Sequence, residues 1–75
     1  MNDLAKEVME TIIPATKIMA KSIIERNCQK LGIDPEHLTK DDLAKLMAEI
    51  EKGVQFFAPS PSIAEEALDR LHKMV

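Results

Sequence analysis

The sequence predicts an all-α fold, in which a long kinked N-terminal helix packs against an antiparallel helical hairpin as a three-helix bundle. Apolar residues recur at helical spacing through most of the 75 residues, and no segment alternates polar and apolar residues as a half-buried strand does. Helix-capping residues stand between the apolar segments, and the connections are short enough to make neighbouring helices antiparallel. The expected elements of this single domain, residues 1–75, are a helix over 3–31, a connector with a short turn over 32–39, a helix over 40–57, a turn over 58–62 and a helix over 63–75.

The first expected helix carries an unusually wide apolar stripe. Its apolar residues come in adjacent pairs that recur after eleven residues: Val8/Met9, Ile12/Ile13, Met19/Ala20 and Ile23/Ile24. Eleven residues are close to three helical turns, so the pairs stack into a stripe roughly 160° wide, whereas an ordinary surface helix shows ~100°. We expect such a stripe to be covered on two sides, by the hairpin and by a second copy of the protein.

Pro14 is a conflict inside this helix, because proline removes the backbone hydrogen bond to the Glu10 carbonyl. The eleven-residue recurrence of apolar pairs continues across Pro14. This favours a kinked helix over two separate helices, although the sequence does not decide between them. The end of the helix is clearly marked. Gly32 suits the left-handed position after the last turn, and Ile33 suits the apolar contact of a Schellman motif.

The connector is organised by capping residues. Asp34 followed by Pro35 predicts one short helical turn. Thr39 then suits the N-cap of the next helix, with Asp42 in the third helical position as a variant of the capping box. Leu38, before the cap, is placed to form the hydrophobic staple of that helix.

The helix over 40–57 has one apolar face and two unusual positions. Gly53 lies inside the helix, weakens it by up to about 1 kcal/mol relative to alanine, and suits the close approach of a neighbouring helix. Phe56 points away from the apolar face, so we expect it to be exposed in a monomer. The inward positions are Leu43, Leu46, Met47, Ile50, Val54 and Phe57.

Two prolines, Pro59 and Pro61, end this helix and begin the next. The last helix has two possible caps, and the sequence leaves both open. Ser60 can cap it with Pro61 in the first position, or Ser62 can cap it with Glu65 in a capping box. The inward positions of the last helix are Ile63, Ala67, Leu68, Leu71 and Met74.

The composition limits the class of partner and the compartment. The net charge is −3, with 45% hydrophobic and 31% charged residues, which is a globular composition without the basic excess of nucleic-acid-binding proteins. The longest apolar stretch is far short of the ~20 residues of a membrane span, and no signal peptide is recognisable. The single cysteine excludes a disulfide framework and fits a reducing compartment. We therefore expect a cytoplasmic protein that binds no membrane.

No cluster of residues in the sequence suggests catalysis, a metal or a cofactor. His37 and His72 stand alone, whereas a zinc site needs three or four ligands at suitable spacing. Cys28 lies near the C-terminal end of a helix, where the helix dipole disfavours a reactive thiolate. The carboxylate pairs stand at helix starts, where they stabilise the dipole. The expectation is a protein that is not an enzyme and has no metal or cofactor of its own.

These features predict a small non-catalytic protein–protein interaction or regulatory module. A 75-residue chain without disulfides or metal is near the lower limit for folding alone, and oligomerisation is the remaining route to stability. We therefore expect a homodimer, with another protein as a further partner. The alternative is a helix-turn-helix-like nucleic-acid-associated domain, against which the acidic later helices argue. The residues expected at the interface are Val8, Met9, Ile12, Ile13, Met19, Ile23, Ile24, Asn27 and Phe56.

Overall fold

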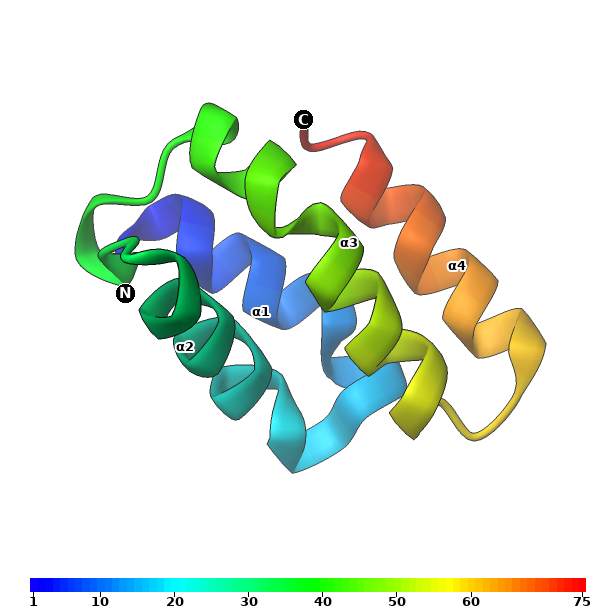
Figure 1. Ribbon diagram of the computed structural model, residues 1–75. Helices are drawn as coiled ribbons and strands as arrows, with labels where there is room; N and C mark the ends of the chain where they lie inside the picture. Colours follow the sequence, from blue (N-terminus) through cyan, green and yellow to red (C-terminus); the bar gives the residue numbers. More distant parts are fainter.

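The computed structural model describes residues 1–75 and consists of helices joined by short connections, without a strand (Figure 1). The all-α fold predicted from the sequence is confirmed. Along the chain the elements are α1 (Asp3–Thr16), the 3₁₀ turn η1 (Lys17–Met19), α2 (Ala20–Leu31), the 3₁₀ turn η2 (Pro35–His37), α3 (Lys40–Phe57) and α4 (Pro61–His72).

The predicted kinked N-terminal helix is present as two joined helical pieces, α1 and α2, and the bend between them lies at Lys17 rather than at Pro14. Lys17 has φ 54° and ψ −130°, which no right-handed helix accommodates. An unbroken helix over residues 3–31 would be about 43 Å long, and the longest dimension of the molecule is 31 Å. The chain therefore reverses its direction here, and α2 returns alongside α1 (Figure 1).

The last turn of α1 is held by bonds that compensate for the break. Thr16 is buried, and its hydroxyl donates to the Ile12 carbonyl at 2.9 Å, within its own helix. The N–H of Lys17 donates to the Ile13 carbonyl. The buried hydroxyl of Thr16 therefore has a hydrogen-bond partner although the helix ends beside it.

The reversal places both halves of the apolar stripe inside one molecule. α1 contacts each of the other three helices, so that its apolar face is covered from three directions. The stripe was expected to need a second copy of the protein, and most of its cover comes instead from α2, α3 and α4 of the same chain. The buried side chains that form this core are Ala5, Val8, Ile12, Ala15, Ala20, Ile23, Ile24, Cys28, Leu38, Leu43, Leu46, Ile50, Val54, Ala64, Ala67 and Leu71.

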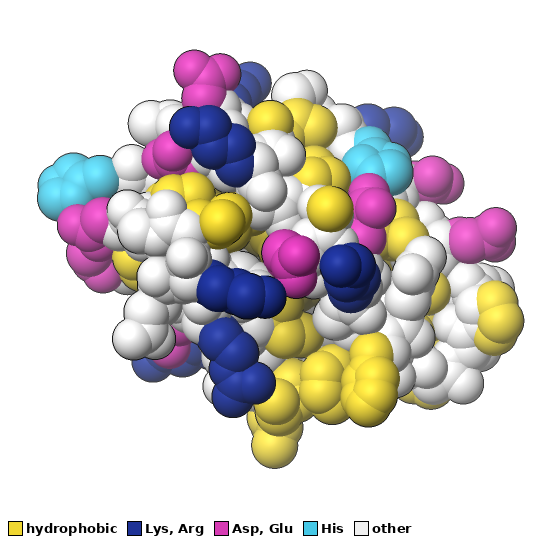
Figure 2. Space-filling model, viewed as in Figure 1, with side chains coloured by type: hydrophobic (Ala, Val, Ile, Leu, Met, Phe, Trp, Pro, Cys, Tyr) yellow, Lys and Arg dark blue, Asp and Glu magenta, His cyan; other side chains and the backbone are white.

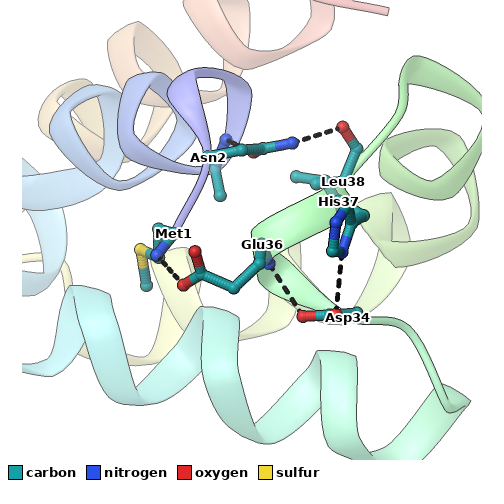
Figure 3. A network of polar contacts seen from close by, with 7 residues as sticks. Met1, Asn2, Asp34, Glu36, His37 and Leu38 are labelled. Carbon is teal, nitrogen blue, oxygen red and sulfur yellow. Dashed lines mark hydrogen bonds and ion pairs between the residues drawn. The ribbon is translucent and has the colours of Figure 1, made fainter.

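Asn2 ties the start of α1 to the connector between α2 and α3 (Figure 3). Its side-chain oxygen accepts from the N–H of Ala5 at 3.0 Å, which caps α1, and its side-chain nitrogen donates to the Leu38 carbonyl at 2.9 Å. Its backbone N–H donates to the Pro35 carbonyl at 3.0 Å. Two of these three hydrogen bonds therefore join the start of α1 to the connector that follows α2.

The end of α2 follows the predicted Schellman motif. Gly32 has φ 69°, which glycine adopts without the penalty that a side chain brings. The N–H of Ile33 donates to the Cys28 carbonyl at 2.8 Å, and the N–H of Gly32 donates to the Gln29 carbonyl at 3.3 Å.

The later caps also follow the sequence. The Asp34 carboxylate accepts from the N–H of Glu36 at 2.9 Å at the start of η2. Thr39 and Asp42 form the reciprocal capping box of α3. Of the two caps left open for α4, Ser60 is the one used, and its hydroxyl accepts from the N–H of Ile63 at 3.4 Å.

The single chain closes its own core to the usual degree. Its accessible surface is 4680 Å² for 8.4 kDa, and a folded monomer of this mass is expected to expose about 4,600 Å². A homodimer is therefore not required for the helices to bury their main apolar faces. An interaction surface has to be sought among the apolar side chains that remain outside the core.

Candidate protein-interaction site

Exposed apolar side chains gather at the end of the bundle where η1 meets the end of α3. Ile18 is 92% exposed and Phe56 is 75% exposed, which makes them the two most exposed large apolar residues of the chain. Met19 and Phe57 line one groove, so these two segments adjoin. In Figure 2 the yellow side chains at the lower edge lie over this end of the molecule. We call Ile18, Met19, Phe56 and Phe57 the end patch.

The two phenylalanines hold one another in a fixed arrangement. Their ring centroids are 4.8 Å apart and the rings are nearly perpendicular, at 87°, which is the favoured edge-to-face geometry. The predicted exposure of Phe56 is confirmed. Phe57 was predicted to face inward and is 41% exposed. It is the last residue of α3, and the deeply buried part of that helix ends one turn earlier, at Val54.

A groove between α2 and α3 leads into the end patch. Its volume is about 180 Å³, and its lining residues are Met19, Ser22, Ile23, Arg26, Asn27, Gly53 and Phe57. Gly53 forms part of the lining because it has no side chain: a Cβ atom there would stand 3.1 Å from Cδ1 of Ile23. The close helix approach predicted at Gly53 is confirmed.

Cations border this groove. Arg26 is the only charged residue in its lining. Further along the same face, the ammonium groups of Lys30 and Lys52 each lie 3.6 Å from the carboxylate of Glu49. Dark blue side chains accordingly stand above and beside the yellow patch in Figure 2. Three cations and one carboxylate give this face a positive excess in a chain whose net charge is −3.

The predicted interface residues are divided between the core and the surface. Val8, Ile12 and Ile24 have no exposed surface, and Ile23 is only 7% exposed, so all four pack within the single chain. The reversal at Lys17 is the physical reason, because it turns the two halves of the stripe toward the shared core. The five predicted residues that retain surface are Met9, Met19 and Asn27, which are half-buried, and Ile13 and Phe56, which are exposed.

Sequence reasoning missed Ile18, Phe57 and the cations beside the groove. Ile18 lies between the second and third apolar pairs of the stripe, and only the backbone of η1 turns it fully outward. Arg26 and Lys30 flank the apolar stripe in the sequence, where cations are ordinarily solvated. Their approach to Lys52 depends on the pairing of α2 with α3, which local spacing does not reveal. A Phe–Phe pair directly before a proline-rich turn was the available signal for Phe57.

The groups with acid, base or nucleophilic character do not converge. Burial, followed by the carboxylates of Asp42, Asp34 and Glu25, raises the pKa of the Cys28 thiol, which is fully enclosed. Nδ1 of His37 contacts Asp34 at 2.9 Å in η2, whereas His72 contacts Glu51 across α4 and α3. No three histidine, cysteine or acidic residues stand close enough together to hold a metal ion.

Comparison with protein-family models, with curated proteins and with solved structures finds no match to the chain. None of its helices combines the length and the apolar character needed to cross a bilayer. The function is therefore inferred from the surface of the molecule.

Proposed function

We propose that this chain is a small non-catalytic interaction module that binds another polypeptide through the end patch and the adjoining α2–α3 groove. The observation that carries the proposal is the exposure of Ile18 and Phe56 beside a groove whose floor is Gly53 and Ile23. The end patch amounts to an apolar area on the order of 400 Å², the size of the largest patch on a typical monomer, and such patches are often functional. We place the module in the cytoplasm, since its one cysteine is a buried free thiol.

Self-association is the second form of this proposal. Two end patches facing one another would bury on the order of 800 Å² in total, below the ~1,200 Å² of stable interfaces. The homodimer that the end patch supports is therefore weak and dependent on concentration. Its contacts would be Ile18, Met19 and Phe56 rather than the buried residues Val8, Ile12 and Ile24.

Selection of random peptides displayed on phage against the purified protein tests the proposal. We expect the selected peptides to compete for one site, and Phe56→Ser to weaken their binding at least about tenfold. The matched control is Leu31→Ser, because Leu31 is an exposed apolar residue at the end of α2 and does not line the groove. Selected peptides that bind Phe56→Ser as well as the wild type would overturn the proposal.

A further inference from the structure

We infer that the occupant of the α2–α3 groove is an acidic amphipathic helix of another protein. This inference rests on the proposed function and adds the chemical class of the partner to it. Three features carry it: the shape of the groove, an arginine without a partner at its edge, and the sign of the charge around it.

The shape of the groove suits side chains presented by a helix. Its apolar contacts come from Met19, Ile23 and Phe57, and Gly53 lets Ile23 pack directly against α3, which forms the floor of the groove. An amphipathic helix enters such a groove with apolar anchors spaced three or four residues apart. The groove lies between α2 and α3, which contact one another, so a third helix can lie along it.

Arg26 identifies the charge of the partner. It is exposed, it lines the groove, and it forms no ion pair within the chain. Its guanidinium group can bind a carboxylate in bidentate fashion beside an apolar anchor. Lys30 and Lys52 share the single carboxylate of Glu49, which leaves a further positive charge on the same face. Acidic residues on the polar edges of a bound helix would complement these three cations.

The same charges argue against a second copy of this chain as the tight occupant. In a two-fold dimer the same face meets itself, so Arg26 would approach the partner's copy of this cationic face. Like charges brought together across an interface disfavour association. The weak homodimer therefore has to use the tip of the end patch, Ile18 and Phe56, and leaves the cationic part of the groove free.

Three designed peptides test the class of partner. The first is a helix with leucines at positions i, i+3, i+4 and i+7 and glutamates at most other positions. The second has lysine in place of each glutamate, and the third keeps the glutamates but scrambles the leucines. We expect the first to bind with a Kd on the order of tens of micromolar and the other two at least about tenfold more weakly. Amide NMR signals of Ser22, Arg26 and Gly53 should shift on binding, since these residues line the groove.

Charge reversal within α2 supplies the matched variants. Arg26→Glu should weaken the acidic peptide at least about tenfold and strengthen the basic one. Lys21→Glu makes the same charge change on the same helix, at an exposed residue that does not line the groove, and should leave both affinities within about twofold. Circular dichroism of both variants establishes that the helices are intact.

Each remaining outcome separates this inference from the proposed function. If the acidic and basic peptides bind the groove equally, or if only display-selected peptides bind there, the acidic partner class is wrong and the interaction module stands. If a short DNA duplex shifts the same NMR signals more strongly than the acidic peptide, the partner is a polyanion and the inference fails. If the display-selected peptides bind elsewhere and not at the end patch, the proposed function itself fails.

Discussion

Gly53 and Ile23 form the closest helix–helix approach at the groove: a Cβ atom on Gly53 would stand 3.1 Å from Cδ1 and 3.3 Å from Cγ2 of Ile23. The first atom is the tip of a flexible side chain, but the second belongs to its stiff β-branch. An added methyl group therefore displaces Ile23 by a few tenths of an ångström, toward the open groove beside it.

We expect Gly53→Ala to change the free energy of unfolding by less than about 0.5 kcal/mol, because a helix-propensity gain of up to about 1 kcal/mol is offset by crowding against Ile23. Ile23→Val removes Cδ1, the nearer of the two crowding atoms, so it should cost less in the Gly53→Ala background than in the wild type. Urea unfolding of the four proteins measures this coupling. Additive effects of the two substitutions would contradict crowding of residue 53 against Cδ1 of Ile23.

Lys17→Gly should stabilise the protein by about 1 kcal/mol. A lysine at φ 54° and ψ −130° is strained by about 1–3 kcal/mol, and glycine removes that strain while it loses more entropy on folding. The sign of this change in stability distinguishes a reversal from a continuous helix, because in a continuous helix the same glycine would destabilise the protein by about 1 kcal/mol. Thermal unfolding of Lys17→Gly measures it, and Lys17→Ala controls for the lost charge. Destabilisation by Lys17→Gly alone would place residue 17 in an ordinary helical conformation.

The helix ends could be predicted from the sequence, whereas the reversal between α1 and α2 could not. Helix ends were predictable because capping is local chemistry: Gly32, Asp34 and Thr39 act within a few residues of themselves. The reversal at Lys17 was not, because it carries no glycine and its strain is offset by contacts between α1 and the distant helices α3 and α4. The apolar stripe was identified correctly. The helices that cover it could not be identified, because they meet it only in the folded chain.

The candidate site was predictable only in part, for the same reason. Phe56 could be assigned to the surface from its position on the helix relative to the apolar face. The groove could not be assigned, because it requires α2 and α3 to lie side by side at Ile23 and Gly53. The positive face likewise combines Arg26 with Lys52 from a different helix.

Cys28 should resist thiol reagents in the folded protein. It has no exposed surface, and burial raises the pKa of its thiol, so the reactive thiolate is disfavoured. We expect labelling at mildly alkaline pH to be at least about a hundredfold slower than after denaturation. The matched control is the double variant Cys28→Ala/Gln29→Cys, which moves the thiol to an exposed neighbouring position and should be labelled rapidly. Equal rates for the two proteins would contradict the burial of Cys28.

Asp34 should titrate below the ordinary aspartate value. Its carboxylate accepts from the N–H of Glu36 and contacts His37, and these contacts lower its pKa. A depressed pKa means that the contribution of Asp34 to stability is present above the unfolded-state value of about 3.9 and is lost as the pH falls through the folded-state value. The stability difference between the wild type and Asp34→Asn should therefore shrink between about pH 5 and about pH 2. Carboxyl ¹³C NMR measures the pKa directly, and a value at or above 3.9 would contradict the role of Asp34 as the cap of η2.

The central claim is that the end patch is the contact surface of this protein, and its most direct test is an amide NMR map at two protein concentrations. Between about 50 μM and about 1 mM, weak self-association should shift the signals of Ile18, Met19 and Phe57, and Phe56→Ser should abolish these shifts. Shifts that persist unchanged in Phe56→Ser, or that appear instead around Val75, would contradict the claim, and the absence of any shift in the wild type would contradict the weak homodimer.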